Sequence, residues 1–349
     1  MIVNRGLLDG VMLVEIALLV LAVVVFFSHG LWLFLNHRRV RLLTESSRES
    51  LARLVNRGTI NVEDIALLRA LRQDVQETVF LEVSRNLTGA GKERLRFVAR
   101  EVSLLDRAKK LCESGRWTRR LRGARVLSRM DVADPIVEKL LADPNPAVRA
   151  QAAEWAAVQP SDRIIATMLD MLADPATQAR FAVQDALLRM GGIVADPLAA
   201  FLETHSGSPA ESGLRVAEAL AAIQFRPAAL RHSASDDAGV RIAATNLLGA
   251  IGDAPSAERL TELLKDQDSH VRAAAAHGLG RMQHWQAASQ LAECLRDAVW
   301  QVRRQAALAL RSIGAPGVLF LRRALNSDDR FAADMAQLVL DLPEAAAAG

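Results

Sequence analysis

The sequence contains no tyrosine, only two cysteines and few aromatic residues of any kind. Phe and Trp make up 15 of the 349 residues, which disfavours a β-sandwich, a fold that draws on Tyr, Thr and Ile. Twenty glycines and 11 prolines are too few for a collagen-like or low-complexity chain. Cys112 and Cys294 are too few for a disulfide framework or a four-cysteine zinc site. Abundant Ala, Leu, Arg and Val instead predict an α-rich protein, and the composition indicates no active site.

Charge is unevenly distributed, although the formal net charge is only +3. Residues 36–130 carry 22 Lys or Arg against 11 Asp or Glu, whereas residues 131–349 carry 20 against 27. The basic block directly follows a hydrophobic N-terminus, which favours an anionic membrane surface over a nucleic acid as its partner. Only five of the basic residues are Lys, and the excess of Arg and Ala indicates GC-rich coding and a bacterial source.

The longest apolar stretch is residues 11–35, VMLVEIALLVLAVVVFFSHGLWLFL. Residues 16–35 contain no charged side chain, and a helix rising about 1.5 Å per residue would cross the ~30 Å hydrocarbon core. We therefore expect a single-pass inner (plasma) membrane protein, with residues 1–10 outside and the repeats in the cytoplasm. A cleaved signal peptide fits less well, because the run is long and no small-residue cleavage site follows it. The residues expected at the membrane interface are Trp32, Arg38, Arg39 and Arg41.

Three polar residues, Glu15, Ser28 and His29, lie within the expected span. Polar groups are costly in lipid, so these side chains could contact another transmembrane helix. The alternative is that Glu15 lies at the headgroups, Ser28 bonds back to its own helix, and His29 stays neutral. The sequence leaves both interpretations open.

Residues 36–112 predict a basic, membrane-proximal helical segment. Ser46 and Glu49 have the spacing of a capping box, and the LTGAG segment of residues 87–91 interrupts the helical pattern. The segment could consist of degenerate repeats held near the bilayer, or of helices whose charged faces are simply solvated. After the last helical pattern, residues 343–349 read as a disordered tail.

Residues 113–342 contain an internal repeat of about 30 residues. The segments DPNPAVRAQAAEWA, DQDSHVRAAAAHGLGRM and DAVWQVRRQAALALRSIG begin at Asp143, Asp266 and Asp297. Each has an acid at position 0, Val at +5, Arg at +6 and small residues at +9 and +10. Weaker copies begin at Ser114, Asp174, Pro209, Ser235 and Asn326. The arginine at +6 recurs at Arg120, Arg149, Arg180, Arg215, Arg241, Arg272 and Arg303.

Each repeat predicts a pair of helices. The acid is expected to cap the second helix, and Val, the small pair and a later Leu form one apolar stripe along it. Glycines such as Gly249, Gly252, Gly280 and Gly314 are expected to end these helices. A single pair cannot bury its own apolar face, so several pairs must stack into a solenoid.

This pattern resembles the short HEAT-like repeats named after phycobilin lyases, over roughly residues 114–342. The resemblance implies an all-α, right-handed α-solenoid of about seven helix pairs whose second helices line a concave face. The fourth repeat departs from the pattern, because it lacks the acid and follows the THSGSP loop of residues 204–209.

No cofactor or metal site is predicted. The di-iron hydroxylases of this repeat class use His-Glu pairs, and none of the seven histidines here is followed by Glu. His270, His277 and His284 are spaced by seven, and Cys294 could join them, but Gly280 is expected to end the helix first. No Walker loop, G-x-G-x-x-G or nucleophile elbow is present. The net negative charge of residues 131–349 opposes nucleic-acid binding.

The recurring Asp and Arg could form a charged binding stripe, but capping and packing within the repeats is the preferred interpretation. Positions +11 and +15 are expected to point away from the buried stripe, where they would form a row of mixed charge. Trp155, Trp285 and Trp300 are candidate binding centres, although Trp117 and Trp300 share position +3 and could pack between repeats. The predicted protein-binding residues are Arg125, Arg129, Glu154, Trp155, Asp185, Arg189, Asn246, His277, Arg281 and Arg304.

Taken together, these patterns predict a non-enzymatic, membrane-anchored scaffold that docks partner proteins at the cytoplasmic face. An accessory subunit of a membrane complex, such as a glycosyltransferase or a transport assembly, would be one instance. Lipids would be contacted through the anchor and the basic segment, with no metal or nucleic acid involved. The alternative is a membrane-tethered enzyme or cofactor-binding protein that uses the concave groove.

Overall fold

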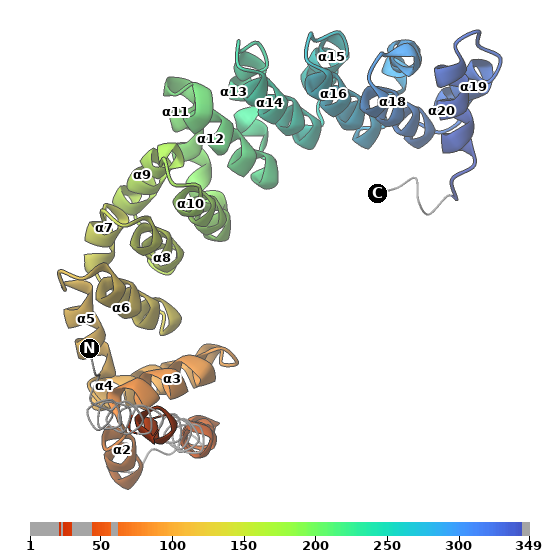
Figure 1. The fold of residues 1–349 in the computed structure, drawn as a ribbon. Helices are drawn as coiled ribbons and strands as arrows, with labels where there is room; N and C mark the ends of the chain where they lie inside the picture. The colour runs from red at the N-terminus through yellow and green to blue at the C-terminus, as the bar shows by residue number, and fades with distance from the viewer. Residues whose placement is uncertain (1–20, 22–23, 30–43, 57–61, 344–349) are drawn as a thin grey trace, which may run out of the picture. The chain divides into compact units, whose positions relative to one another are not determined.

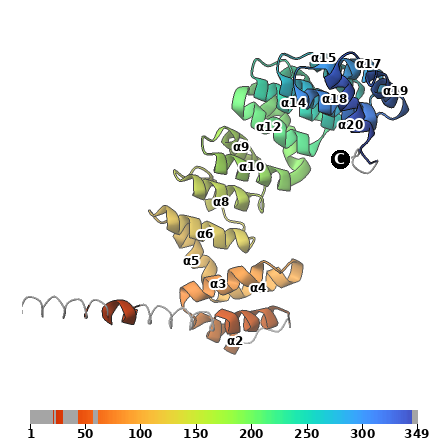
Figure 2. The same ribbon diagram turned by 45° about the vertical axis from the view of Figure 1, so that its right-hand side comes forward.

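A computed structural model describes residues 21, 24–29, 44–56 and 62–343. All regular structure in these residues is helical, as the composition predicts. The chain divides into two compact units, Met1–Val132 and Ala133–Gly349. Figure 2 shows the helices of both units in a second orientation.

The predicted membrane localisation is wrong. No helix among the described residues is both long and apolar enough to cross a membrane. Of the expected span, the structure describes residues 21 and 24–29, which are helical. The Ser28 hydroxyl donates to the Val25 carbonyl at 3.0 Å, so it bonds within its own helix. Lying outside the described residues are Glu15, Trp32, Arg38, Arg39 and Arg41.

The first unit is built from short helices packed around aliphatic side chains. Its described helices are residues 44–56, α2 (Val62–Arg69), α3 (Gln73–Ser84), α4 (Gly89–Glu101), α5 (Leu104–Cys112) and α6 (Trp117–Arg129). Ser46 lies inside a helix that has already begun by residue 44, so it is not the predicted N-cap. The helical pattern is interrupted at residues 85–88, because α3 ends at Ser84 and α4 begins at Gly89, so residues 89–91 of the predicted interruption already belong to α4.

Helices α5 and α6 approach each other at a glycine. A Cβ atom on Gly123 of α6 would lie 2.4 Å from the carbonyl oxygen of Ala108 on α5. The absence of a side chain therefore allows the two backbones to pack closely. This pair contains the first of the predicted repeats, which begins at Ser114.

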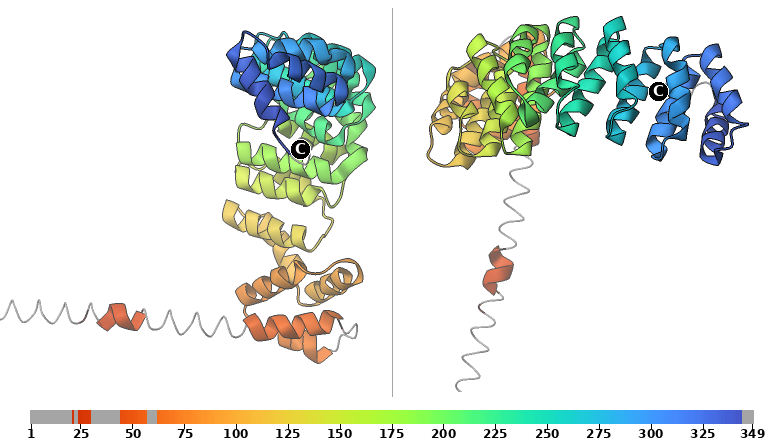
Figure 3. Two further views of the ribbon diagram at one scale, coloured as in Figure 1. Left: turned by 90° about the vertical axis from the view of Figure 1, so that its right-hand side faces the viewer. Right: turned by 90° about the horizontal axis from the view of Figure 1, so that it is seen from above.

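The second unit consists of seven helix pairs (Figures 1 and 3). The first helices of the pairs are α7 (Ile136–Leu141), α9 (Asp162–Asp170), α11 (Ala195–Thr204), α13 (Arg226–His232), α15 (Ala254–Leu263), α17 (Ala288–Glu293) and α19 (Ala315–Ala324). The second helices are α8 (Pro146–Ala156), α10 (Thr177–Met190), α12 (Gly207–Leu220), α14 (Ala238–Ile251), α16 (Ser269–Arg281), α18 (Trp300–Ser312) and α20 (Arg330–Leu340). Short 3-10 segments, η1 (Met171–Ala173) to η5 (Cys294–Arg296), join some of them.

The helices of this unit form two layers. Each second helix contacts the next along the chain, from α8 through to α20, and most first helices also contact their neighbours. Within this unit, Figure 1 shows the second helices on the inner side of the curve. This arrangement confirms the predicted stack of helix pairs, while its right-handed sense stays a prediction.

The predicted apolar stripe forms the core between the layers. The valines at +5 of four repeats, Val148, Val240, Val271 and Val302, are fully buried. Among the predicted helix ends, Gly252 and Gly314 do follow helices and have positive φ angles of 72° and 82°. Gly249 and Gly280 instead lie inside α14 and α16. A Cβ on Gly280 would lie 2.9 Å from the Cα of Ala309, so this glycine allows close helix packing.

The acid at position 0 does not cap the second helix, contrary to the prediction. The N-cap is two residues later in three repeats, at Asn145, Asp237 and Asp268, whose side chains accept hydrogen bonds from the first turn. The acid at position 0 accepts a hydrogen bond from the amide at +2, as Asp266 does from Asp268 at 2.8 Å. It therefore holds the turn that precedes the helix.

Candidate functional site

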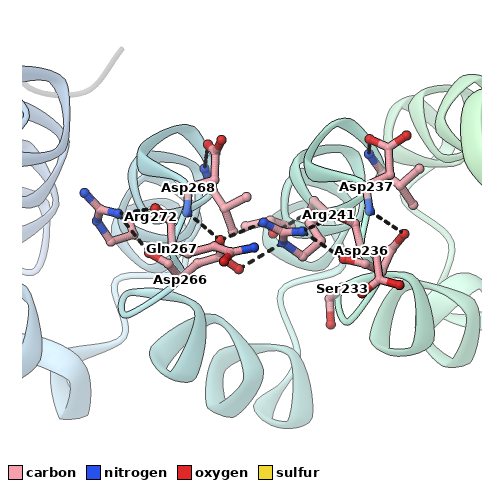
Figure 4. Close-up of polar contacts among 12 residues, drawn as sticks. Ser233, Asp236, Asp237, Arg241, Asp266, Gln267, Asp268 and Arg272 are labelled. Carbon is pink, nitrogen blue, oxygen red and sulfur yellow. Dashed lines mark hydrogen bonds and ion pairs between the residues drawn. The ribbon is translucent and has the colours of Figure 1, made fainter.

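The recurring Asp and Arg side chains form bonds between consecutive repeats. Asp174, Asp266 and Asp297 each bind the arginine at +6 of the preceding repeat through two hydrogen bonds of 2.6–3.1 Å. The pairs are Arg149–Asp174, Arg241–Asp266 and Arg272–Asp297, and the second is drawn in Figure 4. Because these charges are bound within the stack, they hold repeats together and are not a free binding stripe.

Each of these arginines also binds its own loop. Nη1 of Arg241 donates to the carbonyls of Ser235 at 2.9 Å and Asp236 at 3.0 Å, and Arg272 does the same one repeat later. One guanidinium thus joins a loop to the acid of the next repeat (Figure 4). The pKa of Asp297 lies below its ordinary value because hydrogen bonds and the charge of Arg272 outweigh burial, which alone would raise it.

This series of ion pairs is interrupted where the acid is missing. Arg180 binds the carbonyls of Asp174 and Pro175, but the fourth repeat offers it no aspartate. Arg215 is exposed and pairs with Glu211 of its own helix at 2.7 Å. The sequence departure at the fourth repeat therefore coincides with a change in how repeats are bonded.

Several predicted site residues are already engaged within their own unit. Trp155 is 0% exposed, so it belongs to the core and cannot be a binding centre for a partner. Asp185 pairs with Arg189 at 3.1 Å, and Glu154 accepts from Gln151 at 2.9 Å. Arg125 and Arg129 are exposed on α6 of the first unit. Arg304 lies with its guanidinium carbon 5.9 Å from the ring centre of Trp300.

Three other predicted residues, Asn246, His277 and Arg281, line one pocket of about 190 Å³ on consecutive second helices. A fourth polar side chain, Glu218 of α12, joins them. The sequence pattern did not identify Glu218. In the repeat that begins at Pro209, the position expected to point outward, +11, is Leu220. The irregular loop before this helix was the one signal that its register could differ.

Small residues make room for this pocket. Gly249 of α14, with Ala274 and Gly278 of α16, completes the lining. A Cβ added to Gly249 would lie 2.9 Å from the Cα of Gly278, so the two helices touch through their backbones. The absence of side chains at this contact therefore allows α14 and α16 to pack closely where they line the pocket.

The polar groups of the pocket are unpaired among the described residues. Neither a side-chain hydrogen bond nor an ion pair joins Glu218, Asn246, His277 or Arg281 to another residue of that part of the chain. Burial raises the pKa of the Glu218 carboxyl, and the charges of Arg281 and Arg215 only partly oppose this. Burial, followed by the charge of Arg281, lowers the pKa of His277, which favours its neutral form near pH 7.

Exposed aromatic rings mark a second region, on α18 and α20. Trp300 is 55% exposed and Phe331 is 66% exposed. Arg303 lies 5.1 Å from the ring centre of Phe331, and its Nε has no hydrogen-bond partner in the described part of the chain. Trp285 is also exposed, as expected of a residue outside the core.

No metal centre is present among the residues that the structure describes, since no three His, Cys, Asp or Glu side chains gather there. Cys294 is buried, which raises the pKa of its thiol to about 11 and leaves it protonated.

Comparison with known proteins supports the repeat assignment. Residues 226–311 and 257–340 match the family model of HEAT repeats. No curated protein matches the chain. The matched residues lie within the second unit, where the repeat motif is clearest.

Several solved structures match large parts of this chain. An engineered protein is 17% identical, with 86% of this chain and 95% of that chain covered and a TM-score of 0.40. Human deoxyhypusine hydroxylase is 18% identical, with 68% and 95% covered and a TM-score of 0.30. A structure of Kap95p with RanGDP is 11% identical, with 78% and 49% covered and a TM-score of 0.50. The family match supports HEAT repeats over residues 226–340, and the likeness to Kap95p supports an α-solenoid fold.

Proposed function

We propose that this chain is a non-enzymatic scaffold that binds partner proteins through the second helices of its Ala133–Gly349 unit. The observation that carries the proposal is the pocket on α12, α14 and α16. Its four polar side chains have no partner among the described residues, whereas the arginines and aspartates between repeats are bonded to one another. Polar groups that the fold leaves unused are available to an external ligand.

Two further features support protein binding. The HEAT-repeat solenoid is a fold that presents an extended surface of stacked helices, which suits a large partner better than a small molecule. The pocket is also small for a cofactor, because its volume is about 190 Å³ and typical small-molecule sites have volumes of ~300–1,000 Å³.

Site-specific photo-cross-linking tests the proposal. A p-benzoylphenylalanine at Asn246 on α14 is expected to cross-link a partner in cells that produce the full chain. The matched control is the same group at Glu258, an exposed residue on first helix α15. Equal cross-linking from both positions, or from Glu258 alone, would show that the second helices are not the binding surface.

A further inference from the structure

The pocket on α12, α14 and α16 contains one carboxylate, Glu218, whose charge the fold compensates only in part. Glu218 is half-buried, whereas Arg281 at the same pocket is exposed and therefore solvated. Removing a carboxylate from water costs free energy unless a cation or hydrogen-bond donors replace the lost hydration. Among the described residues, no cation lies within ion-pair distance of Glu218. A cationic ligand would therefore be bound most favourably at the Glu218 carboxylate.

The neighbours of Glu218 offer acceptors to such a cation. Asn246 contributes a carbonyl oxygen, and His277, whose pKa is lowered by burial, offers an unprotonated ring nitrogen near pH 7. Both lie on the helices that follow α12, so the three groups face one space. Gly249 and Gly278 line the same space and add no side chain to it.

The charge of the whole unit acts in the same direction. Residues 133–349 carry 20 basic and 26 acidic side chains. A net negative surface attracts cationic partners over distances of about a Debye length, ~10 Å at 0.1 M salt.

Building on the proposed function, we propose that this pocket binds the basic side chain of an arginine or lysine of the partner protein. The guanidinium or ammonium group pairs with Glu218 and donates to Asn246 and His277. The cavity of about 190 Å³ is somewhat larger than the ~150 Å³ cavity that holds a benzene ring, so one long side chain fits. An acidic group is the opposing hypothesis, in which Arg281 is the main contact.

Because Glu218 and Arg281 have opposite charges, substituting each of them should change the affinity for a basic probe in opposite directions. The probe is N-acetyl-arginine amide, titrated into the labelled full chain and followed by NMR at the His277 ring. Glu218→Gln is expected to weaken binding about tenfold, because it removes a charge-assisted hydrogen bond. Arg281→Gln is expected to tighten binding about twofold, because it removes a like charge that is partly screened.

Two controls define the result. N-acetyl-citrulline amide, which has a similar shape but no charge, is expected to cause no saturable shift. Asp185→Asn removes one negative charge from α10, outside the pocket, and is expected to change the affinity less than twofold. Equal binding of citrulline, an equal loss in Asp185→Asn, or tighter binding in Glu218→Gln would each overturn the proposal.

The outcome is separable from that of the proposed function. If Asn246 cross-links a partner but the arginine probe does not bind at Glu218, the basic-side-chain proposal fails and the binding surface stands. If neither occurs, both proposals fail.

Discussion

Arg241 holds Asp266 of the next repeat with one edge of its guanidinium, through Nε to Oδ2 at 3.0 Å and Nη2 to Oδ1 at 3.1 Å. The side chains are only 6% and 10% exposed. The carboxylate also accepts from the Asp268 amide, and the Asp266 carbonyl accepts from Arg272. One aspartate therefore joins its own turn, its own helix and the preceding repeat.

This relationship predicts that Asp266→Ala destabilises the second unit strongly. The substitution leaves the Arg241 guanidinium buried without its counter-charge, and breaking a buried pair costs about 3–5 kcal/mol. Urea unfolding followed by circular dichroism measures the change in unfolding free energy. The control is Glu211→Gln, which removes an exposed pair and is expected to cost no more than about 1 kcal/mol. Similar losses in the two variants would contradict a stabilising role for the Arg241–Asp266 pair.

The contact between Gly249 and Gly278 predicts a second, steric effect. Gly249→Ala places a methyl group 2.9 Å from a backbone atom that cannot rotate away, so α14 and α16 must separate. Overpacking of this kind costs about 1–3 kcal/mol, measured as the shift in thermal unfolding. Gly192→Ala is the matched control, since no atom lies within 4 Å of its added Cβ. An unchanged unfolding temperature in Gly249→Ala would show that the helices can adjust without cost.

Glu218 predicts a pH dependence of stability. Its pKa is raised in the folded state, so the folded chain keeps this proton to a higher pH than the unfolded chain does. Stability is therefore lost as the pH rises through a window that begins near the ordinary value of 4.5. Glu218→Gln lacks this loss and is expected to be slightly more stable than the parent chain at pH 7, by less than about 1 kcal/mol because the group is partly solvated.

Unfolding curves of both chains between pH 4 and pH 7 check this expectation. The difference in stability should grow with pH and favour the glutamine variant. A difference that shrinks or reverses as the pH rises would mean that Glu218 is stabilised as an anion by a contact within the fold.

We expect the thiol of Cys294 to react slowly with thiol reagents in the folded chain. Because burial raises its pKa to about 11, very little thiolate is present near pH 8. A thiol-specific disulfide reagent is expected to label it only as fast as the surrounding repeats open, and at once in denaturant. Mass spectrometry of the Cys294 peptide at timed intervals measures the rate. Rapid labelling of the folded chain would contradict the burial of this residue.

Much of the repeat architecture follows from short-range patterns in the sequence. Val240 and Val271 recur at one position of the motif, and both lie in the core, because a helix turns the same face inward wherever the spacing is kept. The sequence also showed that Asp266 and Arg272 occupy positions, 0 and +6, whose residue types recur from repeat to repeat. It could not show that Asp266 binds Arg241, because that bond depends on how one repeat stacks on another.

The sequence by itself determined the helix pairs, their period and their buried stripe, since these follow from side-chain spacing along a single helix. The tertiary structure alone decided that Trp155 is core, that Glu218 and not Leu220 joins the pocket, and that Gly249 lies against Gly278. The predicted membrane localisation was also overturned, because no helix among the described residues is both long and apolar enough to cross a membrane. The burial of Trp155, the place of Glu218 in the pocket and the contact of Gly249 with Gly278 all depend on the register and contact of segments distant in sequence, which no local pattern encodes.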